Sequence, residues 1–168
     1  MIETIIHKDS FFTNEYTGDI NQIDAHIKHL ITFDKGRVLS NEGGYQSNDI
    51  TFGFHELIVF AINSLNSINQ KVKLANFWVN INKGEHSNKV HNHTLDSWSA
   101  VYYHKVCCEK SSLNFHNLIP IINSSVCSYY PKEKQMIFFK GVQPHSVSAC
   151  NGVDHERISI AFNLPKCS

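Results

Sequence analysis

Two histidines two residues apart, His91 and His93, are followed much later in the chain by a third, His145, and then by Arg157. Side chains alternate across an extended segment, so His91 and His93 are expected to point the same way. His145, arriving from a later strand, would complete three nitrogen ligands around one transition-metal ion. Arg157 would add a planar cation that suits a carboxylate. The combination predicts a metal site with an adjoining carboxylate-binding site.

Each residue of this set also has a less specific explanation. A pair of histidines at this spacing is more often incidental than a metal site. Asp96, the nearest carboxylate, would replace His93 as a ligand if the turn folded back, giving two histidines and one acid. Arg157 alone would fit an exposed strand arginine paired with Asp154 or Glu156. We favour three histidines because His93 has the in-phase spacing and Asp96 does not.

The composition indicates a compact globular chain without a charge bias. Of its 168 residues, 42% are apolar and 18% are charged, which predicts one domain with its own core. Lys plus Arg and Asp plus Glu number 15 each, so no net field favours nucleic acid, and no apolar run is long enough to span a bilayer. We expect a small-molecule or peptide substrate and no nucleic-acid or membrane partner. A homodimer would be ordinary for a fold of this size.

The five cysteines form no CxxC pair, and vicinal Cys107 and Cys108 are poorly placed to bridge each other. The first residues lack the basic and apolar regions of a secretory signal. We therefore expect a reduced, cytoplasmic protein whose cysteines serve as small hydrophobic residues and surface thiols.

Hydrophobic spacing predicts helices in the first half of the chain and strands in the second. An apolar stripe predicts a helix over residues 20–31, with Asp19 as its N-cap. A second helix is predicted over about 55–69, and Gly43 and Gly44 predict a turn between the two. From residue 73 onward, short runs bounded by turns predict strands over 75–81, 97–104, 111–115, 135–139, 145–148 and 157–164.

The last of these strands is the most informative. Arg157, Ser159 and Asn163 fall on one face, while Ile158 and Phe162 fall on the other. This alternation predicts a sheet backed by helices with a small polar cavity inside, where residues 1–72 are mainly helical support and 73–168 form the barrel. The same alternation fits an ordinary α+β layer with its polar face in water, and alternation alone does not choose between them.

Several blocks of sequence occur in the order seen in a known family. In chain order they read SNEGGYQS over 40–47, WVN over 78–80, Gly84, HNH over 91–93, WSAVYY over 98–103, PH over 144–145 and RISIAFNL over 157–164. Over roughly residues 40 to 165 the chain resembles a family of 2-oxoglutarate- and Fe(II)-dependent oxygenases of bacteria and their phages. It departs from the family pattern at Thr94, where proline is usual, and at Ala100, where glycine is usual. Residues 113–118 replace a segment that usually ends in Asp-Pro-Arg.

The resemblance implies a mainly β fold, a double-stranded β-helix (jelly-roll) barrel backed by two or more N-terminal helices. By the same resemblance Fe(II) would be held by His91, His93 and His145. Arg157 would anchor the C5 carboxylate of 2-oxoglutarate. The other positions assigned to this cosubstrate are Ser159, Tyr102 and Asn80.

The implied activity is that of a dioxygenase, by default a hydroxylase of unknown substrate. It would couple oxidative decarboxylation of 2-oxoglutarate to oxidation of a C–H bond. One alternative is a cupin-type metal-dependent dioxygenase or isomerase, because Gly84 leading to His91-x-His93 resembles the first cupin motif. Another is an inactive barrel that acts as a binding module, since fold does not fix function. Arg157 distinguishes these alternatives, because only a 2-oxoglutarate-dependent oxygenase needs a carboxylate anchor.

Overall fold

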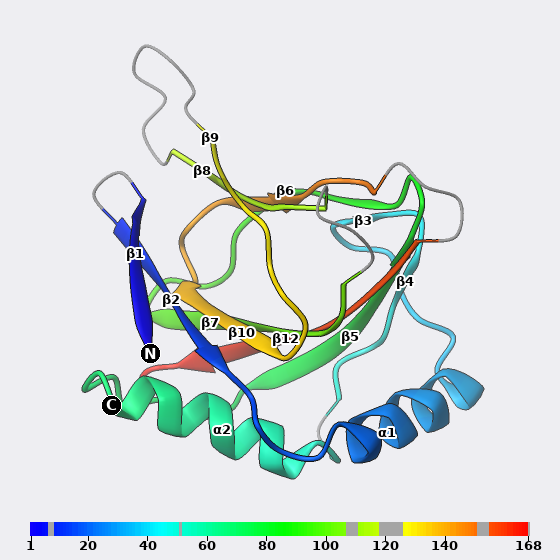
Figure 1. The fold of residues 1–168 in the computed structure, drawn as a ribbon, viewed down its shortest axis with the longest axis horizontal. Coiled ribbons are helices and arrows are strands. Elements are labelled where there is room, and N and C mark those ends of the chain that lie inside the picture. The colour runs from blue at the N-terminus through cyan, green and yellow to red at the C-terminus, as the bar shows by residue number, and fades with distance from the viewer. Residues whose placement is uncertain (7–8, 51, 107–110, 118–125, 151–154, 168) are drawn as a thin grey trace.

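Two antiparallel β-sheets face each other, and two helices cover the outer side of the larger sheet (Figure 1). The computed structural model describes residues 1–6, 9–50, 52–106, 111–117, 126–150 and 155–167. The larger sheet has the strand order β1 (Ile2–Ile6), β2 (Asp9–Glu15), β10 (Gln135–Lys140), β7 (Ser97–Lys105), β12 (Glu156–Pro165), β5 (Asn76–Lys83) and β4 (Tyr45–Gln46). The smaller has the order β3 (Asn41–Glu42), β6 (Ser87–His91), β11 (His145–Val147), β8 (Leu113–His116) and β9 (Val126–Tyr129). This mainly β arrangement is the predicted jelly-roll fold.

Both predicted helices are present. The first, α1 (Ile20–Phe33), begins where the Asp19 side chain accepts a hydrogen bond of 2.8 Å from the Asn21 N–H, which confirms the predicted N-cap. Ile23, Ile27 and Leu30 form its buried stripe. The second, α2 (His55–Asn66), ends three residues earlier than predicted and buries Leu57, Ala61 and Leu65. Both helices lie on the outer side of the larger sheet (Figure 1), and their buried apolar residues belong to one core cluster with residues of that sheet.

Alternation along the strands divides the core into two layers. Phe77 and Val79 on β5 and Ile160 and Phe162 on β12 face the helices. The residues between them on the same strands face the smaller sheet, as the alternation of polar and apolar residues along β12 predicts. Between the sheets, one half of the interior is filled by an apolar cluster of Phe11, Tyr103, Leu113, Phe115, Ile137 and Phe139. The other half contains the polar side chains of the candidate site.

The turn predicted at Gly43 and Gly44 connects the two sheets, because β3 belongs to the smaller sheet and β4 to the larger. Both glycines have positive φ, +70° and +69°. A Cβ on Gly44 would lie 2.7 Å from the carbonyl oxygen of Ile81, so the backbone of β5 leaves no room for a side chain there. The turn therefore needs glycine for both conformation and space.

The cysteine prediction is wrong at one position. Cys150 is disulfide-bonded, whereas Cys127 and Cys167 are free. The partner of Cys150 lies outside the described residues, as do Cys107 and Cys108. Within the described part of the chain, neither helix is both long and apolar enough to cross a membrane.

Candidate metal centre and cosubstrate cavity

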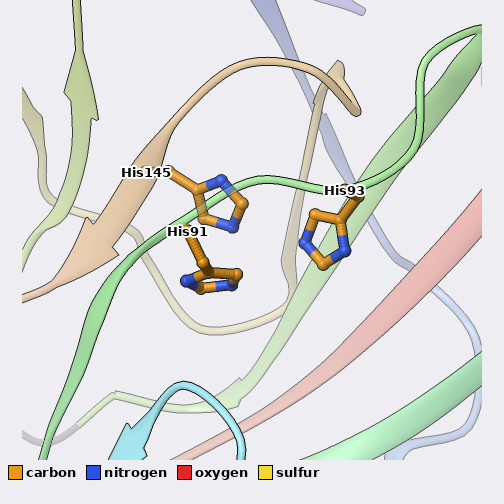
Figure 2. A group of neighbouring side chains, drawn as sticks. All are labelled: His91, His93 and His145. Atoms are coloured by element: carbon orange, nitrogen blue, oxygen red, sulfur yellow. The ribbon is translucent and has the colours of Figure 1, made fainter.

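The three predicted histidines converge between the sheets (Figure 2). His91 is the last residue of β6, and His145, the first residue of β11, is its direct partner across the antiparallel pair. His93 lies in the segment that follows β6. The ligand atoms of the three side chains all lie within 4.8 Å of one another. A metal–nitrogen bond is about 2 Å long, so two nitrogens on one metal lie at most about 4 Å apart, and small ring movements would close the site.

Backbone carbonyls fix the orientation of two of the rings. The Nδ1 of His91 lies 2.7 Å from the carbonyl oxygen of Lys89, and the Nδ1 of His145 lies 2.9 Å from that of Gln143. A carbonyl oxygen can only accept, so each Nδ1 carries the proton and donates it. The Nε2 lone pair of each ring is then free to bind a metal. A backbone carbonyl that accepts from the other ring nitrogen is a usual support of a histidine ligand.

Burial keeps the three imidazoles neutral. Desolvation lowers the pKa of His145 well below its ordinary value, and the neighbouring His91 adds to this effect. Desolvation, with a contribution from His91, lowers the pKa of His93 to about 4. It also lowers the pKa of His91, partly offset by the hydrogen bond to Lys89. Neutral imidazoles are the form that a transition metal requires, so the donor set fits Fe(II) chemically.

His93 reaches the site through its loop rather than through strand alternation. Its backbone N–H donates a hydrogen bond of 2.7 Å to the carbonyl oxygen of Gly141, in the turn after β10. The Gly141 N–H in turn donates to the carbonyl oxygen of Ser97 at 2.8 Å. Asp96 is not a member of the histidine group, the one metal-ligand group among the described residues. The structure therefore brings His93, and not Asp96, to the other two histidines.

Arg157 is only 3% exposed and lies on the interior face of β12, beside Asn82 of β5. Its Nη1 donates a short hydrogen bond to the Ser111 hydroxyl. Glu156, one of its two alternative partners, instead bridges Lys83 at 3.0 Å and Lys105 at 3.1 Å. The other, Asp154, lies outside the described residues. A buried guanidinium lining the cavity that the histidines also line is suited to a carboxylate ligand.

A row of polar side chains crosses the sheet next to Arg157. Strand register places Ser159 of β12 between Asn80 of β5 and Tyr103 of β7, and all three line the interior cavity. The Oδ1 of Asn80 and the Oγ of Ser99 are buried and have no hydrogen-bond partner among the described residues. Buried polar atoms are rarely left unpaired, so these two atoms point to a polar ligand in the cavity.

Tyr102 does not belong to this cavity, which corrects the assignment made from the sequence. It is fully buried on the opposite face of β7, packed edge-on against Tyr16 at 5.5 Å between ring centroids. Its neighbour Tyr103 lines the cavity instead. Burial raises the pKa of the Tyr103 hydroxyl, while the charge of Arg157 acts in the opposite direction. Three residues were not assigned from the sequence: Tyr103 and Ser99, which line the cavity, and Ser111, which accepts the hydrogen bond from Arg157. Tyr103 is an even number of residues from Ser99 along β7, so the two side chains are on the same face of the strand, and this spacing is the feature that indicates Tyr103.

The interior cavity is narrow. Its volume is about 40 Å³, and it shares Ser40, Trp78, His91 and His93 with an open outer groove of about 530 Å³.

A jelly-roll with three convergent histidines and a buried arginine defines a metal-dependent barrel protein with a carboxylate-binding interior. Residues 76–163, more than half of the chain, match the family model described as "Putative 2OG-Fe(II) oxygenase". The chain belongs to this family of 2-oxoglutarate- and Fe(II)-dependent oxygenases. A search of curated proteins finds no significant match.

Solved structures share the fold at low sequence identity. The non-haem α-ketoglutarate-dependent epimerase SnoN from nogalamycin biosynthesis aligns with a TM-score of 0.74 and 13% identity, over 94% of this chain and 78% of its own. HygX from Streptomyces hygroscopicus, solved with nickel and 2-oxoglutarate, aligns with a TM-score of 0.69 and 12% identity, over 92% and 82%. A Pseudomonas putida prolyl-4-hydroxylase aligns with a TM-score of 0.66 and 10% identity, over 96% and 95%.

Proposed function

We propose that the chain is a 2-oxoglutarate- and Fe(II)-dependent hydroxylase in which His91, His93 and His145 hold the iron and Arg157 anchors the cosubstrate. One observation carries the proposal: three neutral histidines and a buried arginine line the same cavity between the sheets. Family membership supplies the cofactor and the cosubstrate. The roles of the individual residues are inferred from their positions.

The residues divide the work by their chemistry. Arg157, with Ser159 and the Tyr103 hydroxyl beside it, would bind the C5 carboxylate of 2-oxoglutarate by charge-assisted hydrogen bonds. Asn80 and Ser99 supply further polar contacts along the cavity wall. Bound Fe(II) would activate O2, which is the oxidant; oxidative decarboxylation of the keto acid to succinate and CO2 would supply two of the four electrons that O2 accepts, and the C–H substrate the other two. The apolar cluster between the sheets keeps that end of the cavity dry.

Hydroxylation of a C–H bond is the outcome we propose, with a small molecule or a peptide as substrate. Proteins of the same fold include an epimerase and a prolyl-4-hydroxylase, and HygX has been solved with hygromycin B bound. The fold therefore accommodates different oxidation outcomes and substrates of different size. The choice between them depends on the residues around the outer groove.

The test is an anaerobic titration of the Fe(II)-loaded protein with 2-oxoglutarate, read by the visible metal-to-ligand charge-transfer band of the chelate. We expect a saturable band in the wild type. His145→Ala should abolish it, whereas His29→Ala, on the exposed side of α1, should leave it unchanged. Arg157→Lys should keep iron and raise the Kd for 2-oxoglutarate by about 10- to 100-fold, because the planar fork is lost. Iron binding without a band would refute the 2-oxoglutarate assignment.

We also propose a cytoplasmic, single-domain protein, on the basis of its composition and cysteine spacing; a homodimer would be consistent with its size. The disulfide at Cys150 argues against a fully reduced location. Alkylation of thiols at the moment of cell lysis, followed by mass spectrometry of the intact chain, decides the point. Five alkylated thiols would support the cytoplasmic proposal, and protection of Cys150 would contradict it.

A further inference from the structure

The open groove of about 530 Å³ lies on the outer side of the histidines. Trp78, His91 and His93 line both this groove and the interior cavity, so a ligand in the groove would lie directly beside the metal position. The groove is therefore the place where a substrate of the proposed oxygenase would be accessible to the metal. The chemistry of its walls can be read from six polar or charged side chains and two exposed aliphatic ones.

A hydrogen-bonded chain of side chains runs along one wall. Arg37 donates a short hydrogen bond to the Oδ1 of Asp49, and Asn76 donates to the Oδ2 of the same carboxylate at 2.7 Å. Asn163 then donates to the Oδ1 of Asn76 at 2.8 Å. The charges of Arg37 and Asp49 cancel within this chain. The wall is consequently close to neutral, which does not favour a charged ligand.

Three buried polar atoms on the groove residues have no hydrogen-bond partner among the described residues. They are the Oε1 of Gln46, the Oδ1 of Asn163 and the Nε of Arg37. Gln46 is only 3% exposed, and all three residues line the groove. Unsatisfied buried groups are costly, and these atoms have almost no accessible surface, so their side chains would turn toward the groove to meet a ligand. Turned that way, they suit a ligand that offers N–H donors to the two oxygens and an acceptor to the arginine.

The rim of the groove has a different character. Leu39 and Val90 line it and are 65% and 57% exposed. Lys89, the other cation at the groove, is drawn to Glu42 at 3.5 Å. A sugar or polyol would match the polar wall but would place hydroxyl groups against the aliphatic rim. A polypeptide, which has main-chain amides and apolar side chains, matches both the wall and the rim.

We propose that the groove binds the substrate as an uncharged segment of polypeptide. Main-chain N–H groups would donate to Gln46 and Asn163, a main-chain carbonyl would accept from Arg37 Nε, and apolar side chains would pack on Leu39 and Val90. The proposal rests on the proposed function only in taking this ligand to be the substrate. The binding itself requires neither iron nor 2-oxoglutarate.

The experiment uses metal-free protein and the capped tripeptide acetyl-leucyl-alanyl-leucine amide as probe. Trp78 and Trp98 are the only tryptophans of the chain, and Trp98 is buried in the core beneath the sheet. In a Trp98→Phe background, Trp78 fluorescence therefore reports on the groove. If that variant fails to fold, wild-type amide chemical shifts of groove residues serve as the readout. Free leucine and methyl glucoside are the charged and polyol comparators.

We expect saturable binding of the capped peptide and weaker binding of both comparators. Gln46→Leu and Asn163→Leu, which remove the buried amide oxygens, should each raise the Kd by about tenfold. Asn14→Leu is the matched control, because this strand asparagine bonds Ser64 and lines neither cavity. Binding insensitive to the two groove variants, tighter binding of leucine or the glucoside, or no binding at all would overturn the proposal.

The two proposals fail separately. A charge-transfer band with Fe(II) and 2-oxoglutarate, but no peptide binding to the groove, would remove the peptide proposal and leave the oxygenase. Saturable peptide binding in a protein that gives no such band would remove the oxygenase assignment and leave a peptide-binding groove.

Discussion

At the scale of single residues, the site depends on atoms that a sequence pattern does not specify. The types and order of His91, His93, His145 and Arg157 were enough to predict that they meet. The Nδ1 protons, however, are held by backbone carbonyls that any residue would supply at Lys89 and Gln143. The residue types therefore predict which side chains bind the metal. The tautomer with the proton on Nδ1, which leaves Nε2 free for the metal, follows only from the folded backbone.

The two adjacent tyrosines show a second limit of the sequence. The segment over 97–105 has bulky apolar residues on both faces, with Trp98 and Tyr102 toward the helices and Val101 and Tyr103 toward the cavity. With both faces buried, hydrophobic alternation carries no information about which face is interior. The cavity tyrosine could be assigned only by its phase with Ser99, whose partner in β12 is Asn163.

The tyrosines also provide a matched pair of variants. Tyr103→Phe should weaken 2-oxoglutarate binding by about 10- to 100-fold, because it removes a hydrogen bond to a carboxylate worth about 1.5–3 kcal/mol. Tyr102→Phe should leave that affinity unchanged. Its hydroxyl is buried without a partner among the described residues, so its loss should be neutral or raise the Tm. Calorimetric titration with 2-oxoglutarate measures the affinity of each variant, and thermal unfolding measures its Tm. A larger loss of affinity in Tyr102→Phe than in Tyr103→Phe would mean that Tyr102 belongs to the site.

At the scale of elements, the sequence predicts the two helices and four strands of the larger sheet, which are β5, β7, β10 and β12. Asp19 and the stripe of Ile23, Ile27 and Leu30 determine α1 through local interactions. The smaller sheet was harder: of β6, only Asn88 is buried, so SNKVH has no apolar alternation to detect. Strands β1 to β4 were also missed, two of them being only two residues long. Such strands are determined by their partners rather than by their own pattern.

The turn after β10 should position His93. A Cβ on Gly141 would lie 2.1 Å from Ser97 Oγ and 2.7 Å from the carbonyl oxygen of Thr94. The carbonyl oxygen of Gly141 accepts the hydrogen bond from the His93 N–H. Gly141→Ala should therefore displace the His93 loop, lower stability by about 1–3 kcal/mol and weaken metal binding about 10-fold or more. Competition with a chromophoric chelator measures the affinity.

Ser97→Ala is the control for this prediction, because it removes the Ser97 hydroxyl without pushing on the turn. The variant loses hydrogen bonds to Thr94 and should keep its metal affinity. Wild-type affinity in Gly141→Ala would mean that the turn does not position the ligand.

A second element-scale prediction concerns the attachment of α1 to the sheet. The Nε2 of His104 on β7 lies 2.7 Å from Asp24 of α1, and this hydrogen bond, with the charges of His104, Lys28 and Lys105, lowers the pKa of Asp24 below 3.8. A carboxyl whose pKa is lowered by folding stabilises the fold above its unfolded value and loses that contribution as the pH falls through the folded value. Asp24→Asn should thus lower the free energy of unfolding at pH 7, and with it the Tm, by less than about 1 kcal/mol of stability because the carboxylate is half exposed.

The pH dependence provides the check on this prediction. The difference in Tm between wild type and Asp24→Asn should shrink as the pH drops below 3.8, the ordinary value for the carboxyl. Lys28→Ala, which removes an exposed neighbour at 3.9 Å and leaves the His104 hydrogen bond in place, should change the Tm much less than Asp24→Asn does. A constant difference at all pH values would show that the carboxylate charge is not what attaches the helix.

At the scale of the whole molecule, the apolar side chains that pack the fold are distinct from the metal ligands, although His145 contacts Phe139 of the apolar cluster at 4.6 Å between ring centroids. The helix-facing core and the apolar cluster between the sheets include none of the three histidines. Neutral, desolvated imidazoles also impose no charge repulsion on the metal-free state. The barrel is therefore expected to fold before the metal binds, which distinguishes it from small domains that fold only around a zinc ion.

Metal binding should then stabilise a chain that is already folded, by mass action on the native state. At a free Fe(II) concentration of 100 times its Kd, the gain is about 2.7 kcal/mol, or roughly 5–10 °C in Tm for a chain of this length. Anaerobic thermal unfolding at several Fe(II) concentrations measures it, and chelation should return the Tm to the metal-free value without loss of far-UV circular dichroism. His145→Ala should remove the shift while His29→Ala retains it. A metal-free protein that is unfolded at 25 °C would instead make the histidines a structural centre, because the two cores would then be too weak to hold the sheets together without it.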